Sequence, residues 1–202
     1  MTKTEKAVQW MIQTANNPLH GYDQKYRWGE RGDYDCSSAV ITAWARAGVP
    51  VRFAGATYTG NMYSAFKKCG FDDVTKMVNR KTGKGLLRGD VLLNRKSHTA
   101  MYIGGGQIAQ ASINEKGSAT GGAPGDQTGK EFLIRSYYNY PWDYVLRFHE
   151  IVKQAYKKTD YEIAKEVIQG LWGNGSDRIR RLRNAGYSPE YIQKLVNLMI
   201  LG

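Results

Sequence analysis

The chemistry that this chain could perform centres on Cys36, which lies where a loop gives way to an apolar segment, residues 39–47. If this segment is a helix, its first-turn N–H groups and its dipole stabilise a thiolate. The cysteine can then attack a carbonyl group at neutral pH. The alternative is a small buried hydrophobic residue at a helix start. The choice between the two depends on which other groups the chain supplies.

A cysteine nucleophile needs a general base, and the sequence contains three histidines. His98 is the best placed, because it directly precedes a predicted strand, residues 99–103, and rigid elements position catalytic groups well. His20 lies in a loop rich in aromatic residues and His149 at the end of the domain, where a surface role is the simpler interpretation. The sequence therefore predicts a pair formed by Cys36 and His98.

The imidazole also needs a polar partner at its second ring nitrogen. If residues 104–106 form a three-residue hairpin loop, Ala100 lies opposite Gln110. Gln110 then becomes a diagonal neighbour of His98 on one sheet face, about 7–8 Å away at the backbone. A two- or four-residue loop would place Gln110 on the other face. Ser112, which lies opposite His98 in this register, is the second candidate.

The elements that must position these residues follow from the spacing of apolar side chains. Helical spacing over residues 4–15, and again after Cys36 as far as Gly48, gives way to short alternating runs that are typical of strands. We expect a further helix over 60–68, strands over 91–93, 99–103, 107–111, 131–135 and 144–148, and a surface loop over 112–130. Helices followed by an antiparallel sheet predict an α+β domain over residues 1–149.

Beyond this domain the pattern is helical again. A connector over residues 150–159 is expected to lead into three short helices, over 162–169, 176–184 and 189–200. A three-helix unit of this size, residues 160–202, is typical of a binding module rather than of a catalytic domain.

Composition restricts the possible functions further. The few cysteines and histidines lack metal-ligand spacing, so the sequence predicts no metal and no cofactor. No apolar run is long enough to span a membrane and the N-terminus is unlike a signal peptide, so we expect synthesis in a cytoplasm without membrane insertion. The net charge of +11 indicates an anionic partner. The arginines of residues 178–183 fall on several helix faces and form no recognition-helix pattern, which makes nucleic acid the weaker alternative.

Three motifs occur here in the order and spacing of a known family. Tyr-Asp-Cys-Ser-Ser around Cys36, Gly-Asp-Val-Leu before His98, and His-Thr-Ala-Met-Tyr-Ile-Gly-Gly-Gly-Gln-Ile from His98 onward resemble the NlpC-type papain-like cysteine peptidases. The similarity is to their phage peptidoglycan hydrolase branch and covers about residues 4–149. It implies that Cys36 attacks a stem-peptide amide, that His98 acts as base and then acid, and that Gln110 orients the ring. Other members often have histidine at this third position.

The same resemblance implies a tyrosine that helps to hold the oxyanion, together with the backbone N–H of the nucleophile. Tyr22 matches by its place after Gly21, and Tyr26 by its Tyr-x-Trp-Gly pattern. Asp35 either supports the turn that carries the nucleophile or is an ordinary helix N-cap.

The C-terminal unit, over about residues 160–201, resembles the three-helix cell-wall-binding repeat of pneumococcal phage lysozymes, with a distinctive Trp-Gly-Asn-Gly turn. The implied ligand is the disaccharide-peptide unit of peptidoglycan. The aromatic, amide and charged groups that suit such a ligand are Trp172, Asn174, Arg178, Arg181 and Tyr187. For Trp172 and Tyr187 the alternative is a role in the small core of the unit.

Both resemblances imply peptidoglycan as the partner and a phage-type endolysin as the function. The implied reaction is cysteine-dependent hydrolysis of the amide between D-γ-glutamyl and the diamino acid of the stem peptide, which leads to host lysis. The alternative is an N-acetylmuramoyl-L-alanine amidase. Such a protein stays in the host cytoplasm until a holin-type pore releases it to the wall.

Overall fold

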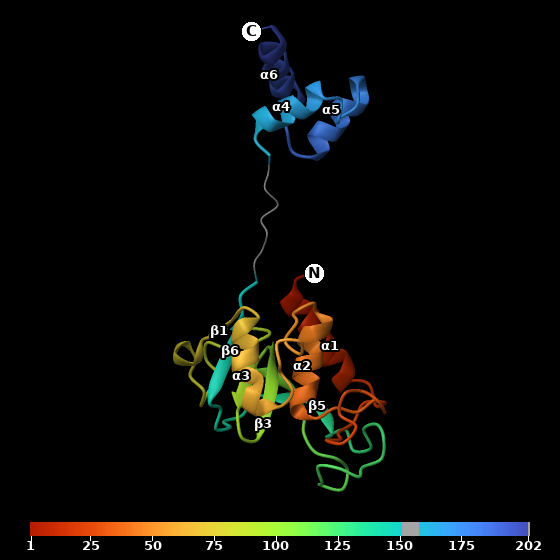
Figure 1. The fold of residues 1–202 in the computed structure, drawn as a ribbon, viewed down its shortest axis with the longest axis vertical. Helices are drawn as coiled ribbons and strands as arrows, with labels where there is room; N and C mark the ends of the chain where they lie inside the picture. Colours follow the sequence, from red (N-terminus) through yellow and green to blue (C-terminus); the bar gives the residue numbers. More distant parts are fainter. Residues whose placement is uncertain (151–157, 202) are drawn as a thin grey trace. The chain divides into compact units, whose positions relative to one another are not determined.

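The computed structural model describes residues 1–150 and 158–201, and the chain divides after Glu150 into two compact units (Figure 1). Residues 151–157, which make up most of the expected connector, lie outside the described residues. Within the described ranges, no helix combines the length and the apolar composition needed to cross a membrane.

The N-terminal unit places its helices before most of its sheet. Its helices are α1 (Lys3–Ala15), α2 (Cys36–Arg46), α3 (Thr59–Lys68) and the short 3-10 helix η1 (Thr75–Met77). Its strands are β1 (Phe71–Asp73), β2 (Val91–Asn94), β3 (His98–Gly104), β4 (Gln107–Ala111), β5 (Phe132–Ser136) and β6 (Tyr144–Phe148). The strands form one six-stranded antiparallel sheet in the order β1-β6-β2-β3-β4-β5. The α+β prediction is confirmed, whereas β1 and η1 were not predicted.

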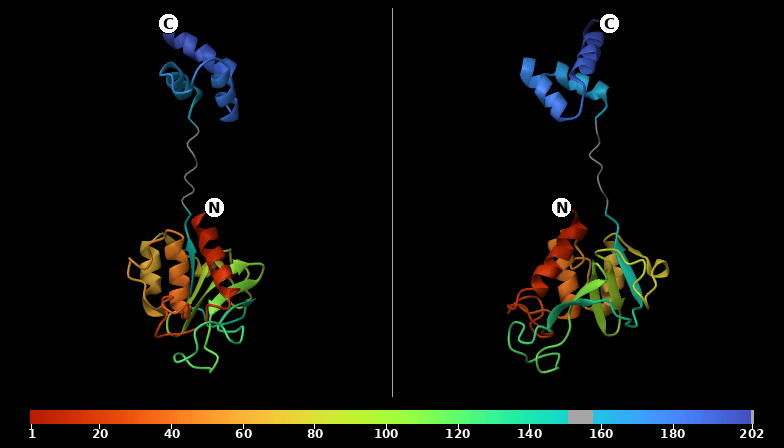
Figure 2. Two further views of the ribbon diagram at one scale, coloured as in Figure 1. Left: turned by 90° about the vertical axis from the view of Figure 1, so that its right-hand side faces the viewer. Right: turned by 180° about the vertical axis from the view of Figure 1, so that it is seen from behind.

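The sheet is covered on one face by helices, and Figure 2 shows α1, α2 and α3 together on that side. Alternate residues of the central strands, such as Leu93 and Met101, pack there against α1 and α2 in one core. The residues between them, such as Leu92 and Ala100, pack on the other face with Trp142 in a second core. Both faces of the central strands are therefore largely apolar. Polar side chains suited to catalysis are expected near the ends of these strands.

The hairpin between β3 and β4 differs from the predicted one in its turn. Gly104 pairs with Gln107, so the loop has two residues, Gly105 and Gly106, both with positive φ. The predicted three-residue loop is wrong. The register then shifts between Tyr102 and Gly104, and this bulge restores the predicted pairing farther along, where Met101 lies opposite Ala109.

The C-terminal unit contains α4 (Asp160–Ile168), α5 (Gly175–Asn184) and α6 (Pro189–Leu201). Thr159 begins α4 with a capping box that it forms with Glu162. Aliphatic side chains from all three helices form the core of the unit: Ile163, Ala164, Val167, Leu182, Ile192 and Val196. Trp172 and Tyr187 pack against this core while remaining partly exposed.

Candidate active site

Cys36 is the first residue of α2, and its neighbours fix the start of that helix. The Asp35 carboxylate accepts a hydrogen bond from the Ser38 N–H at 2.6 Å, and the Ser38 hydroxyl accepts one from the Asp35 N–H at 2.9 Å. This capping box supplies partners for N–H groups that the first turn would leave unpaired. The thiol is consequently held at the helix start in a buried position, 8% exposed.

The protonation state of Cys36 differs from the one expected from the sequence. Burial, with a smaller contribution from the nearby Asp35 carboxylate, raises the pKa of the thiol to about 12. The backbone N–H groups of Thr99, Ser37 and Cys36 act in the opposite direction but are outweighed. The expectation that the helix start alone provides a thiolate at neutral pH is therefore wrong, because loss of hydration dominates.

His98 and Gln110 are brought together as the register predicts. The His98 Nε2 lies 3.0 Å from the Gln110 Oε1, and the Tyr138 hydroxyl donates to the same oxygen at 3.5 Å. An amide oxygen can only accept, so Nε2 carries the proton and Nδ1 keeps its lone pair. Ser112, the second candidate, instead uses its backbone N–H to donate to the Glu131 carbonyl at 2.7 Å.

A cluster of aromatic side chains surrounds the imidazole. The His98 ring stacks on Trp142, with centroids 5.9 Å apart and an interplanar angle of 27°, and Tyr140 approaches it edge-on at 5.6 Å. Burial lowers the pKa of His98, while its hydrogen bond to Gln110 raises it. Tyr138, Tyr140 and Trp142 were not predicted from the sequence, although the density of aromatic residues between two predicted strands was a usable signal.

The thiol and the imidazole approach the same end of the sheet from different elements. Cys36 faces the backbone of Thr99, the residue after His98, and β3 begins at His98. Among the described residues, the two catalytic candidates are not hydrogen-bonded to each other. Such contacts are often long without substrate and tighten when it binds.

Of the two tyrosines proposed for the oxyanion, the structure brings Tyr22 to the cysteine. Tyr22 is 4% exposed, and burial followed by the proximity of Cys36 raises its pKa to about 12. Its oxygen accepts a hydrogen bond from Gln24 at 3.0 Å, so its own proton can be donated elsewhere. The Tyr26 ring instead lies beneath the Arg31 guanidinium, with 3.7 Å between the ring centroid and the guanidinium carbon.

Asp35 combines the two roles considered for it, because it caps α2 and also pairs with Arg27. The Arg27 Nη1 lies 2.6 Å from the Asp35 carboxylate and 3.4 Å from the Ser37 hydroxyl, and its Nη2 donates to the Thr57 carbonyl at 2.7 Å. Arg27 was not predicted as a site residue, because its position inside the aromatic loop gives no indication of this contact. The ion pair ties that loop to the start of α2.

The loop before the cysteine is also joined to the glycine-rich loop of residues 112–130. The buried Asp33 carboxylate accepts hydrogen bonds from the Gly21 N–H at 2.8 Å and from the Gly125 N–H at 2.9 Å. A side chain at Gly21 would place its Cβ 1.9 Å from the Gly125 carbonyl oxygen. Glycine is required at Gly21 for this close approach.

Only some of the candidate ligand residues of the C-terminal unit lie close together. Trp172 and Arg181 line a pocket of about 580 Å³, in which the indole N–H donates to Glu166 at 3.0 Å. The Tyr187 ring stands edge-on to Trp172 at 6.2 Å. Asn174 begins α5 at its N-cap, and Arg178 bonds to Gln193 on α6 at 3.0 Å, so these two lie outside the pocket.

Metal ligands do not cluster in the structure: within residues 1–150 and 158–201, no three His, Cys, Asp or Glu side chains are grouped to hold an ion.

Comparison with known proteins gives one family match that covers most of the chain. The model of the endolysin-like domain family matches residues 28–107 and 108–194. A lysozyme of Streptococcus phage Cp-7 is 60% identical over 35 residues, which is 17% of this chain. The chain spans only 10% of the length of that curated relative.

Solved structures that align with this chain include NlpC1 from Trichomonas vaginalis. It is 17% identical with a TM-score of 0.44, and the match covers 73% of this chain and 44% of that protein. The P60 domain of an antigen from M. avium subspecies paratuberculosis is 16% identical with a TM-score of 0.42, over 72% of this chain and 96% of that domain.

Proposed function

The chain belongs to the endolysin-like domain family, and we propose that it is a cysteine-dependent peptidoglycan hydrolase with an NlpC-type papain-like catalytic unit. The observation that carries the proposal is the arrangement around Cys36. A thiol at a helix start faces the strand that begins with His98, and Gln110 fixes the proton of that imidazole on Nε2. These groups can perform acyl transfer without a metal.

The mechanism begins with both partners neutral. Burial raises the pKa of Cys36 and lowers that of His98, which disfavours a preformed thiolate–imidazolium pair. In the proposed first step, the His98 Nδ1 accepts the thiol proton as sulfur attacks the amide carbonyl. His98 therefore acts as a general base during the attack.

The oxyanion that forms in this step needs donors that are already in place. We assign these to the Tyr22 hydroxyl and the Cys36 backbone N–H. Collapse of the tetrahedral intermediate breaks the C–N bond, and His98 returns the proton to the departing amine. Water, deprotonated by the same imidazole, then hydrolyses the thioester and regenerates the thiol.

The proposed bond is a stem-peptide amide, with the link between D-γ-glutamyl and the diamino acid favoured. Mass spectrometry of fragments released from purified walls tests this assignment directly. New amino ends on the diamino acid are expected. New N-terminal alanine would instead identify an N-acetylmuramoyl-L-alanine amidase.

For the C-terminal unit we propose cell-wall binding through the pocket that contains Trp172 and Arg181. An aromatic face beside a guanidinium suits a sugar ring that carries a peptide carboxylate. Asn174, Arg178 and Tyr187 remain proposed contributors, with Tyr187 acting by holding the Trp172 ring. The proposed site of action is the host cell wall, reached from the cytoplasm by holin-type release.

A further inference from the structure

A cationic pocket in the N-terminal unit includes part of the turn that precedes His98. Its volume is about 720 Å³, and it opens between the start of α3, the turn from β2 to β3 and the start of β6. The residues that line it are Tyr58, Gly60, Arg80, Arg95, Lys96, Asp143 and Tyr144. The mechanism proposed above uses none of them.

The pocket wall is continuous with the surroundings of His98. Lys96 precedes His98 by two residues, in a turn that Asn94 holds by accepting bonds from the Lys96 and Ser97 N–H groups at 3.0 and 3.1 Å. The Ser97 hydroxyl is hydrogen-bonded at 2.8 Å to the hydroxyl of Tyr140, the ring that packs on the imidazole. The pocket therefore shares with the imidazole the turn that leads into β3.

The positive charges of the pocket are not neutralised by neighbouring carboxylates. In the same unit, Arg27, Arg88 and Arg147 each form an ion pair with a carboxylate. Among the described residues, Arg80 and Arg95 have no acidic side chain within ion-pair distance, and Lys96 has none either.

Backbone groups orient two of these cations. Arg80 donates to the Trp142 carbonyl at 2.5 Å, and Arg95 donates to the Gly60 carbonyl at 3.3 Å. The single carboxylate that lines the pocket, Asp143, accepts from the Arg95 backbone N–H at 2.8 Å. Three cations against one carboxylate leave the pocket with an excess of positive charge.

We propose that this pocket binds a free carboxylate of the stem peptide and so positions the amide at Cys36; this rests on the proposed function. A guanidinium presents several N–H donors in one plane, which suits a carboxylate, and Tyr58 and Tyr144 supply apolar walls for the adjoining chain. Proximity to His98 favours a group on the molecule being cleaved over one on a separate polymer.

The test compares purified walls stripped of phosphate-containing polymers, before and after their carboxyl groups are converted to amides with carbodiimide and ammonia. For wild type, the wall concentration that gives half-maximal release should be about tenfold lower on untreated walls than on amidated walls. Amidation removes the charged carboxylate that the pocket is proposed to bind. A double variant, Arg95→Gln with Lys96→Gln, should lose most of this preference, because its half-saturating concentration on untreated walls rises; the remainder comes from Arg181 in the pocket of the C-terminal unit. Arg95→Lys should keep part of it.

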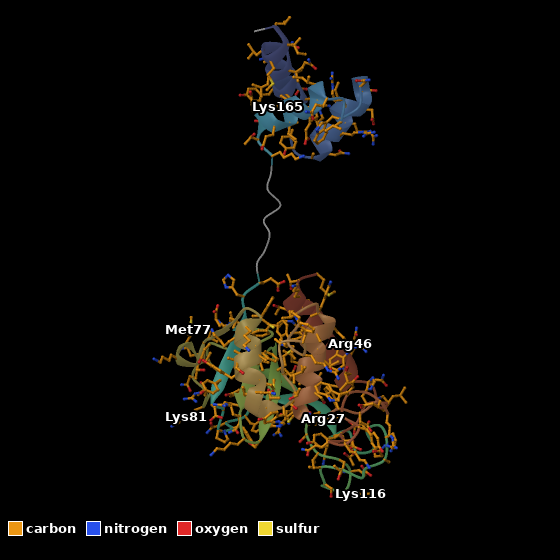
Figure 3. All side chains as sticks on the ribbon, in the orientation of Figure 1. Arg27, Arg46, Met77, Lys81, Lys116 and Lys165 are labelled. Carbon is orange, nitrogen blue, oxygen red and sulfur yellow. The ribbon has the colours of Figure 1, made fainter. Side chains whose placement is uncertain are left out.

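Arg46→Gln is the matched control, since Arg46 is an exposed arginine at the end of α2 opposite Cys36 (Figure 3). It should behave as wild type. A double variant that keeps the wild-type preference would overturn the pocket assignment. A defect seen only on walls that retain their phosphate polymers would also overturn it, in favour of phosphate recognition. If wild type releases nothing from untreated walls, the proposed function itself fails, which is a different outcome.

Discussion

Burial acts in opposite directions on the two residues at the centre of the proposed site. It raises the pKa of the Cys36 thiol and lowers that of the His98 imidazole, so both are neutral near pH 7. Gln110 contributes by orienting the ring rather than by supplying charge. The reactivity of such a site depends more on the orientation of the imidazole than on a preformed thiolate–imidazolium ion pair.

The pH profile should report the state of His98. The base must be neutral, and the pKa of His98 is lowered below its ordinary value of 6.5, so the acidic limb of kcat/KM is expected below pH 6.5. Gln110→Glu places a carboxylate on Nε2, raises the pKa of His98 and should move this limb to higher pH. Gln110→Ala removes a hydrogen bond that raises this pKa, so the limb should move lower, with roughly tenfold loss of kcat/KM. Unchanged limbs in both variants would contradict the contact between Gln110 and His98.

The choice between the two tyrosines can be tested by removing single hydroxyl groups. Tyr22→Phe keeps the buried ring but removes a proposed oxyanion donor, so kcat should fall by about 100-fold with KM little changed. Tyr26→Phe is the matched control and should leave both constants near wild type, because its ring packs under Arg31. Steady-state kinetics on wall fragments provides the measurement. The reverse pattern would reassign the donor to Tyr26.

At the scale of elements, the start of α2 depends on one carboxylate. Asp35 caps the helix and pairs with Arg27, so it holds together the nucleophile, the aromatic loop and, through Arg27, the Thr57 carbonyl. Asp35 thus shares its positioning role with Arg27, an arginine eight residues earlier in the chain.

Asp35→Ala should lower the free energy of unfolding of the N-terminal unit by roughly 2–4 kcal/mol, since it removes a cap and leaves a half-buried guanidinium without its partner. Asp35→Asn can still accept from the Ser38 N–H and should lose less. Urea unfolding followed by near-ultraviolet circular dichroism distinguishes the two variants. Equal stability of both variants and wild type would show that neither contact supports the fold.

The β3–β4 hairpin was predicted correctly from the sequence in its strands but not in its turn. Alternating apolar residues predicted both strands and the face shared by His98 and Gln110, since a buried face fixes register strongly. The turn was predicted wrongly, because three consecutive glycines accept several loop lengths and a bulge compensated for the difference. Local spacing cannot report such a compensation.

Contacts between distant segments could not be predicted from the sequence for a similar reason. Trp142 reaches His98, and Arg27 reaches Thr57, only once the chain is folded. The degree of burial that raises the pKa of Cys36 is likewise a property of the packed unit. Residue types predicted the catalytic candidates, whereas their protonation states required the tertiary structure.

At the scale of the whole molecule, the chain combines a catalytic candidate with a separate helical unit, and it carries a net charge of +11. Under the proposed function, peptidoglycan is the target of both units. Two weak contacts on one chain bind a polymer more tightly than either alone, provided that both can engage at once. Part of this binding should be electrostatic and should weaken as salt increases.

Wall binding by the C-terminal unit can be measured without hydrolysis in the Cys36→Ala background. Adding Trp172→Ala should weaken cosedimentation with purified walls by about tenfold, because the aromatic face of the pocket is lost. Arg181→Gln should weaken it too, and this change leaves the packing of Trp172 in place. Tyr161→Ala, at an exposed tyrosine on α4, should have no effect. Equal binding by all of these variants would exclude the pocket as the binding site.

Whether Cys36 opens an amide bond of peptidoglycan can be measured by analysing the ends that two cysteine variants release from purified walls. Cys69 is the other free cysteine and lies outside the site, so Cys69→Ala is the matched control. New amino ends should appear at the wild-type rate with Cys69→Ala, and none should appear with Cys36→Ala. Release of amino ends by Cys36→Ala near the wild-type rate would exclude Cys36 as the nucleophile, and release of new reducing sugar ends alone by wild type would exclude amide hydrolysis.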